Sequence, residues 1–225
     1  MRLYHDWEFL EDGRTIELIS VGMATEDGRE LYLINRDTPL ERIRQHEWLN
    51  ANVVPHLPVA LVSGSMETRH LAWNWSHPDA DKIVSLRDMA AAVREFIQFR
   101  GEGHAADCLL PSQEHSTCPA NEVALTGEQP EPFNELWGWY PAYDHVALSQ
   151  LWGPMVKRPP HIPMQTFDVY QEAVRLGDPD LSTGKIGIPP WTGPEHHALA
   201  DARMCKFQHE YLIRYEQSLR TVNEH

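Results

Sequence analysis

Three apolar or alternating segments separated by two polar turns fill the first 35 residues, and this pattern constrains the fold more than any other feature of the chain. The segments span residues 2–9, 15–24 and 30–35, and the turns between them read EDGR and EDGRE. An Asp-Gly pair between alternating segments is a strong hairpin signal, because glycine adopts the positive φ that tight turns require. The chain is therefore predicted to open with a meander of three antiparallel strands.

Most of the later periodic segments predict helices. Pro39 suits a first helical position, and the residues SLRD from Ser85 form a capping box in front of apolar residues at helical spacing. Gly177 is placed to end a helix, and Val146 with residues 148–151 can face the sheet. The predicted elements after the meander are helices over 39–50 and from Ser85, a strand over 135–140, and helices over 143–153, 166–177 and 193–219. This order predicts an α/β fold.

The composition is that of an ordinary globular protein. With 225 residues, 42% hydrophobic and 23% charged, the chain is expected to form one domain over 1–225. Residues 101–132 lack periodicity and are rich in Gly, Pro, Ser, Thr and acids, so they are expected to form a surface insertion. No apolar run approaches the roughly 18 residues of a membrane span, and no secretion signal is present, so we expect no membrane partner and a cytoplasmic location.

Cysteine content and net charge limit the function further. The cysteines are Cys108, Cys118 and Cys205, which cannot all pair with one another, as expected in a reducing compartment. A formal net charge of -14 argues against charge-driven wrapping of duplex nucleic acid. It remains compatible with a small site in which metal ions hold phosphate.

The first predicted strand carries paired acids. Residues two apart in a strand point the same way, so Asp6 and Glu8 share one face with Tyr4. Two carboxylates held close together repel, and a divalent cation is the simplest compensation. The alternative is an edge strand with a solvated acidic face.

Two further acids and a histidine lie near the ends of predicted elements. Asp144 follows a strand at the start of a helix, and Asp201 lies on a helix between alanines that allow close backbone approach. His196 precedes Asp201 by five residues, near that helix start. Each of these residues could instead be a helix-terminal acid, a surface acid or a cap.

Taken together, four carboxylates and a histidine match the needs of two-metal phosphodiester hydrolysis. Oxygen ligands hold two Mg²⁺ or Mn²⁺ ions about 3.5 to 4 Å apart, where one activates water and the other stabilises the leaving oxygen. A histidine outside the ligand set can accept the proton of the water.

The segments DWEFLEDG, IELISVG, LWGWYPAYDHVALSQLWGPM and HHALADAR together resemble the DEDDh 3′–5′ exonucleases of RNase H-like fold, most closely the bacterial RNase AS group. The resemblance covers residues 2–35 and 135–156, and the last helix by its motif. It implies a mixed central sheet with antiparallel first strands, flanked by helices, and a preference for adenylate-rich RNA. The residues that it assigns to metal binding are Asp6, Glu8, Asp144 and Asp201, with His196 as general base.

Two positions depart from the wider exonuclease class. The class usually has Thr after the first-strand Glu and Asn four positions before the third acid, where this chain has Phe9 and Tyr140. These departures argue against a DNA-proofreading function more than they argue against catalytic activity. His197 also competes with His196 for the role of base, although the five-residue step to Asp201 favours His196.

Substrate contacts are predicted from residues that flank these acids. Phe9, Trp139 and Tyr140 could stack on terminal bases, or they could be core aromatics. Glu17 could accept a hydrogen bond from the adenine amine, although a solvent-facing position is the preferred interpretation. A structural zinc site is a further, less favoured hypothesis, and its candidate ligands are His104, Cys108, His115 and Cys118.

Three functions follow from these features. The first is a metal-dependent 3′–5′ exoribonuclease that acts on the 3′ end of single-stranded RNA and releases nucleoside 5′-monophosphates. The second keeps the chemistry but takes single-stranded DNA or short signalling oligonucleotides, and the third is a non-catalytic, RNase H-like module that binds adenylate. The resemblance to RNase AS also implies a homodimer.

Overall fold

The structure is a computed structural model that describes residues 1–63, 69–98, 135–178 and 186–223. Within these residues the main sheet has six strands in the order β6-β3-β2-β1-β7-β8. The strands are β1 (Arg2–Glu11), β2 (Ile16–Thr25), β3 (Glu30–Asn35), β6 (Ile83–Val84), β7 (Glu135–Gly138) and β8 (Phe167–Asp168). β1, β2 and β3 are antiparallel, whereas β7 pairs with β1, β8 with β7 and β6 with β3 in parallel. This confirms the predicted mixed α/β sheet and is compatible with an RNase H-like fold.

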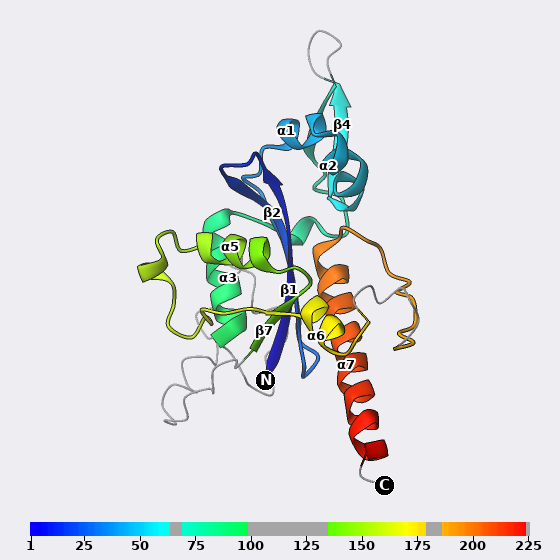
Figure 1. Cartoon of the computed structure of the whole chain (residues 1–225). Helices are drawn as coiled ribbons and strands as arrows, with labels where there is room; N and C mark the ends of the chain where they lie inside the picture. The colour runs from blue at the N-terminus through cyan, green and yellow to red at the C-terminus, as the bar shows by residue number, and fades with distance from the viewer. Residues whose placement is uncertain (64–68, 99–134, 179–185, 224–225) are drawn as a thin grey trace.

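Helices cover both faces of the sheet (Figure 1). On one face, α3 (Leu86–Gln98) and α5 (Ala142–Gln150) pack on a core that contains Leu3 and Trp7 of β1. On the other face, α6 (Val169–Arg175) and α7 (Ala198–Asn223) pack on Tyr4, which directly follows Leu3 in β1 and therefore points to the opposite side of the sheet. The alternation along β1 therefore assigns Tyr4, Asp6 and Glu8, which the sequence predicts to share one face, to the face that α7 covers.

A smaller part of the chain, which we call the arm, extends beyond the sheet and is shown at the top of Figure 1. It contains α1 (Leu40–Gln45), α2 (Glu47–Asn52) and the hairpin of β4 (Val59–Ser63) and β5 (Arg69–Trp73). The prediction of one helix over 39–50 is wrong, because His46 has an extended ψ of 108° and separates α1 from α2. The Nδ1 atom of His46 accepts a hydrogen bond from the Leu49 amide at 3.2 Å and so caps α2.

Other boundaries differ from the prediction for local reasons. The predicted helix over 166–177 begins at Val169, because Asp168 ends β8 and caps α6 by accepting a hydrogen bond from the Tyr170 amide at 2.9 Å. The last helix begins at Ala198, and Val146 is exposed where the prediction had it facing the sheet. The strands β4, β5, β6 and β8 were not predicted, since two to five residues are too few for a clear period. Single 3₁₀ turns form at Val54–His56, Ala80–Lys82 and Met155–Lys157.

The predicted start of α3 is confirmed. The Asp88 amide donates to the Ser85 Oγ at 3.1 Å, and the Ser85 hydroxyl donates to the Asp88 carboxylate at 2.7 Å. Among the described residues no helix is long and apolar enough to cross a membrane. The insertion over 101–132, with its candidate zinc ligands, lies outside the described residues.

Candidate metal site

The pairing of β1 with β7 ends at Tyr4, and Asp144 of α5 binds the backbone of β1 beyond that point. β7 pairs with β1 only from Arg2 to Tyr4, and its last residue, Gly138, pairs with β8 alone. The Trp7 amide donates to the Asp144 Oδ1 at 3.0 Å, so the carboxylate takes a backbone donor that no neighbouring strand occupies. Asp144 is 7% exposed in the first turn of α5 and is thereby fixed at the edge of β1.

The start of α7 crosses the sheet at Gly22, directly beside Asp6. Gly22 and Asp6 are register partners in β2 and β1, so they share the face that α7 covers. A Cβ atom at Gly22 would lie 2.2 Å from backbone atoms of Ala198 and Leu199, a distance that real Cβ atoms do not show. The absence of a side chain at Gly22 therefore lets the α7 backbone approach the acidic strand. Gly22 is a site residue that the sequence reasoning missed, although an isolated glycine in a strand is a signal of close backbone approach.

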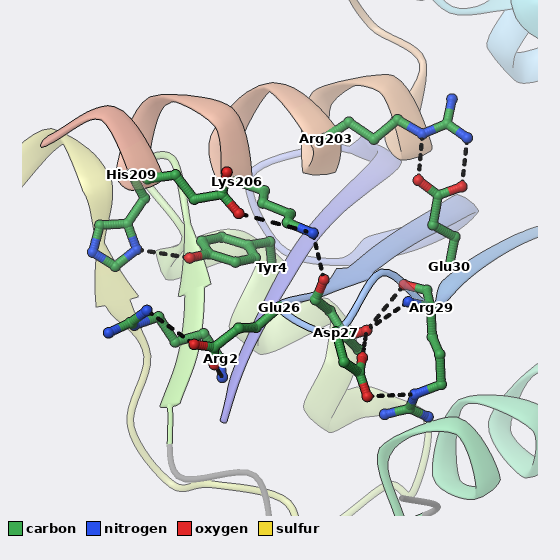
Figure 2. Close-up of polar contacts among 11 residues, drawn as sticks. Arg2, Tyr4, Glu26, Asp27, Arg29, Glu30, Arg203, Lys206 and His209 are labelled. Carbon is green, nitrogen blue, oxygen red and sulfur yellow. Dashed lines mark hydrogen bonds and ion pairs between the residues drawn. The ribbon is translucent and has the colours of Figure 1, made fainter. Parts of the chain in front are cut away.

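Polar contacts along α7 hold the helix in this register (Figure 2). The Arg203 Nε donates to Glu30 at 2.7 Å, and the Lys206 ammonium donates to the Thr25 carbonyl at 2.8 Å. One turn further, the Tyr4 hydroxyl and the His209 Nδ1 are 3.0 Å apart in a buried hydrogen bond. These contacts reach all three antiparallel strands, so they fix where Asp201 lies.

Glu8, His196 and Asp201 come together at this crossing. Each offers one ligand atom, and these atoms all lie within 4.8 Å of one another. Glu8 is buried, while His196 and Asp201 are partly buried. The nearby Asp144 also raises the pKa of Asp6. We call Asp6, Glu8, Asp144, His196 and Asp201 together the acidic cluster.

Burial and mutual repulsion raise the pKa values of the acidic cluster. Burial, followed by the nearby Asp201 and Asp144, raises the pKa of Glu8 to about 8. Burial raises the pKa of Asp144 to about 7, against the hydrogen bond from Trp7. The pKa of Asp201 rises to about 6 through burial, opposed by His196, and the pKa of Asp6 is raised by burial and by all three other acids. The cluster thus resists holding its full negative charge without a cation.

The donor set fits divalent cations. None of the four acids forms an ion pair with a Lys or Arg among the described residues, so no protein cation compensates them there. Carboxylate oxygens are the ligands that Mg²⁺ and Mn²⁺ prefer. Glu8 and Asp201 could hold one ion, with Asp6 and Asp144 available for a second, while His196 offers a ring nitrogen beside them.

The two adjacent histidines have different surroundings. The His197 ring stacks on Tyr32 at 4.4 Å, centroid to centroid, and its Nδ1 accepts a hydrogen bond from the Ala200 amide at 3.4 Å. His197 is therefore used in packing and in capping α7. His196 has a φ of 59° and turns toward Glu8 and Asp201, which agrees with the preference for His196 over His197.

The aromatic residues that the sequence analysis considered for base stacking form two separate groups. Phe9 stacks on Tyr143 with ring centroids 6.2 Å apart and packs against the core that contains Leu3 and Trp7. Trp139 and Tyr140 belong to a second group with Tyr170, where Tyr140 and Tyr170 are 4.6 Å apart. Tyr140 and Tyr143 are exposed, so neither is a core residue.

Glu17 is paired with an arginine of α1. It is the register partner of Leu10, and its carboxylate forms an ion pair with Arg42 of α1. An arginine therefore already occupies the acceptor that the sequence analysis considered for adenine.

The fold and site define an α/β protein with a cluster of acidic residues and a histidine, suited to divalent cations, on an inner strand of a mixed sheet. Sequence comparison then identifies the family. The chain is 33% identical over 204 residues to the 3′–5′ exoribonuclease Rv2179c of Mycobacterium tuberculosis strain H37Rv, which covers 90% of this chain and 88% of the relative. The 3′–5′ exoribonuclease MT2234.1 of strain CDC 1551 matches with the same identity and coverage. The chain belongs to this family of 3′–5′ exoribonucleases, although no family model matches it.

Proposed function

We propose that this protein is a divalent-metal-dependent 3′–5′ exoribonuclease that removes nucleoside 5′-monophosphates from single-stranded RNA. The observation that carries the proposal is the convergence of Glu8, His196 and Asp201 within 4.8 Å, in a chain one third identical to named exoribonucleases. Asp6, Glu8, Asp144 and Asp201 are the proposed metal ligands, as in the DEDDh type. Two bound Mg²⁺ or Mn²⁺ ions would supply Lewis-acid activation of water and neutralise the charge of the leaving oxygen.

The protein groups have separate tasks in this proposal. Asp144 keeps its orientation through the Trp7 amide, so one carboxylate oxygen is fixed and the other is available to a cation. His196 does not cap α7 as His197 does, its ring meets Trp48 edge to face, and it accepts the proton of the attacking water at an imidazole nitrogen. The buried position of Glu8 and Asp144 limits competing water around the reacting phosphate.

Substrate choice and assembly are the finer parts of the proposal. Membership of the RNase AS group would give an adenylate preference, and the exposed Tyr143, which precedes Asp144 in the sequence, is compatible with base stacking. We also propose a homodimer that acts in the cytoplasm. Light scattering after size-exclusion chromatography measures the oligomeric state, and a monomer at micromolar concentration would contradict the dimer.

The decisive experiment measures AMP release from a 3′-labelled oligo(A) in Mn²⁺. Asp6→Ala is expected to reduce release to background, because it removes a proposed ligand. Glu11→Ala is the matched control, since Glu11 is an exposed acid of the same strand, and it should retain activity. Retained activity in Asp6→Ala would reject the site, and faster digestion of a matched DNA oligomer would reject the RNA assignment.

A further inference from the structure

The segment that follows α5 carries basic side chains and is attached to α3. Lys157 ends its single 3₁₀ turn, Arg158 comes directly after, and His161 lies three residues further along the chain. The Gln98 side-chain amide and the His161 Nδ1 atom are 3.0 Å apart in a hydrogen bond that joins the segment to the end of α3. Arg94 lies one turn before Gln98 on the same side of α3, where burial and then the Arg94 charge lower the pKa of His161. We call Arg94, Lys157 and Arg158 the basic patch.

The core holds the basic patch in place. Arg158 donates a hydrogen bond to the Ile162 carbonyl, and Ile162 is buried with Phe96 of α3 and Leu148 of α5. The segment between α5 and β8 is therefore packed against both helices. Cations on a segment with a fixed position lose less conformational entropy on binding than cations on a free loop.

No acid pairs with the basic patch in the part of the chain that the structure describes. Arg94 and Lys157 are exposed, and neither they nor Arg158 forms an ion pair there. Elsewhere on the surface, Arg175 and Arg203 are paired with glutamates. In a chain with a net charge of -14, three cations without acidic partners create a locally positive potential. This potential attracts anions that the rest of the surface repels.

Exposed apolar side chains lie in the same segment as Lys157 and Arg158. Met155, Val156 and Met164 are 68%, 87% and 60% exposed. Single-stranded RNA presents negative phosphates together with uncovered apolar base faces, whereas a duplex keeps its bases stacked inside. A surface that combines cations with apolar side chains therefore fits a single strand better than a duplex.

The helix α5 leads from the acidic cluster to the segment that carries the basic patch, and Figure 1 shows this helix beside α3. Asp144 lies in the first turn of α5, and the segment begins where the helix ends, about 9 Å further along the helix axis. Burial and then the Arg158 charge lower the pKa of His145, the residue that follows Asp144. The basic patch thus begins near the start of α5 and extends to α3.

We propose that the basic patch binds phosphates of single-stranded RNA several nucleotides upstream of the scissile bond. This inference rests on the proposed function, which brings the 3′-terminal phosphodiester to the acidic cluster. The rest of the strand then runs along α5 toward α3, where the cations contact its sugar-phosphate backbone without reading the bases. The basic patch therefore determines the affinity for long substrates, while the acidic cluster performs the hydrolysis.

Substrates of different length test the proposal, because a dinucleotide ends before it reaches the basic patch. On oligo(A) of about 20 nucleotides, the double variant Arg94→Gln with Lys157→Gln should raise KM by at least about fivefold and leave kcat unchanged. The double variant should hydrolyse the dinucleotide ApA like wild-type protein, which also shows that it is folded. Lys157→Arg keeps the charge and should keep the wild-type KM on both substrates.

The salt dependence of kcat/KM on the long oligomer measures the number of phosphate contacts. For single strands each contact contributes about 0.7 to the slope of log(kcat/KM) against log salt, so the double variant should have a slope shallower by about 1.4 at constant Mn²⁺. Arg214→Gln is the matched control for Arg94→Gln, since Arg214 is an exposed arginine of α7 on the other face of the sheet. Arg214→Gln should keep the wild-type slope and KM.

Two results would overturn the role of the basic patch. An equal rise of KM for the dinucleotide and the long oligomer would mean that the double variant acts at the acidic cluster. An unchanged KM and an unchanged slope on the long oligomer would mean that the basic patch serves a different anionic partner.

The two proposals fail in different ways. If wild-type protein releases no AMP from oligo(A), the nuclease assignment fails, and anisotropy titrations of fluorescein-labelled oligo(A) still compare RNA binding by wild-type protein and the double variant. If wild-type protein cleaves RNA and the double variant behaves like Arg214→Gln, the role of the basic patch alone is rejected.

Discussion

His196 combines a strained backbone with a side chain aimed at the acidic cluster. Its φ of 59° lies in the left-handed region, which costs a residue with a Cβ atom about 1 kcal/mol or more. Strain of this kind persists where the surrounding structure determines it, and here it turns the imidazole toward Glu8 and Asp201. The neighbouring His197 has an ordinary structural role in the cap of α7.

Substituting the two histidines should therefore give opposite results. His196→Ala is expected to lower kcat by at least about 100-fold with little loss of stability, because it removes the proposed base. His197→Ala should retain turnover but lower the free energy of unfolding by about 1 kcal/mol, because the cap and the Tyr32 stack are lost. Steady-state kinetics and urea unfolding measure both effects. A larger fall of kcat in His197→Ala would reverse the assignment.

The residue-level prediction succeeded where a period or a spacing determines direction. The alternation of β1 places Asp6 and Glu8 on one face, and the structure has both on the face that α7 covers. For the choice between His196 and His197 the sequence offered only the five-residue step to Asp201, because φ and stacking partners are tertiary properties. Gly22 was missed for the same reason, since the backbone that it meets is 176 residues away.

His209, which is not part of the acidic cluster, should make the free energy of unfolding depend on pH in the acid range. Its ring is buried against Trp137 at 3.7 Å, centroid to centroid, and hydrogen-bonds with Tyr4. Burial, with a smaller effect of Arg2, lowers the pKa of His209 to about 4. The unfolded chain then binds more protons than the folded one between about pH 6.5 and 4.

Because the folded pKa is depressed, the contribution of His209 is complete above about pH 6.5 and is lost as the pH falls toward 4. His209→Asn can keep a hydrogen bond to Tyr4 without a titrating ring. The free energy of unfolding of wild-type protein should therefore fall more steeply than that of His209→Asn between pH 6.5 and 4.5. Urea unfolding at several pH values measures both slopes, and parallel slopes would show that His209 titrates normally in the folded protein.

At the scale of elements, the crossing of α7 over β2 depends on one missing side chain. Gly22→Ala would place a Cβ atom 2.2 Å from the α7 backbone, so the start of the helix must move away from β2. We expect a loss of about 3 kcal/mol or more in stability and a loss of turnover, because Asp201 moves with the helix.

Gly13→Ala is the matched control for this prediction. Gly13 has a φ of 78° and open space around its Cβ position, so alanine there should cost about 1 kcal/mol through backbone strain alone. Turnover should be unaffected. If both variants lost activity equally, general destabilisation rather than displacement of α7 would be the cause.

The elements that the sequence predicted well are those with a local cause. The turns around Gly13 and Gly28 determine the three-stranded meander, and Ser85 determines the start of α3. The strands of the arm and the two-residue strands β6 and β8 depend on pairing with distant segments, which no local pattern encodes. The break between α1 and α2 was missed because His46 fits a helical pattern but serves as a cap.

At the scale of the whole molecule, the acidic cluster joins three distant parts of the chain: β1, the start of α5 and the start of α7. In a chain with 33 acidic and 19 basic residues, four acids meet where no Lys or Arg pairs with them among the described residues. Their repulsion opposes the fold, and the divalent cations of the proposed function would relieve it. Metal binding should therefore stabilise the folded protein as well as activate it.

Divalent cations should raise the thermal unfolding temperature in a way that depends on the cluster. Ions at about 100 times their dissociation constant stabilise by about 2.7 kcal/mol, which corresponds to roughly 5 to 10 °C for a domain of this size. Scanning calorimetry with Mn²⁺ should show this rise in wild-type protein and in Glu11→Ala, but not in Asp201→Asn. Without metal the order should reverse, because Asp201→Asn removes one repelling charge and should unfold at a higher temperature than wild type. An equal Mn²⁺ response in Asp201→Asn would mean that the cations bind elsewhere, and the convergence of these acids would then require another explanation.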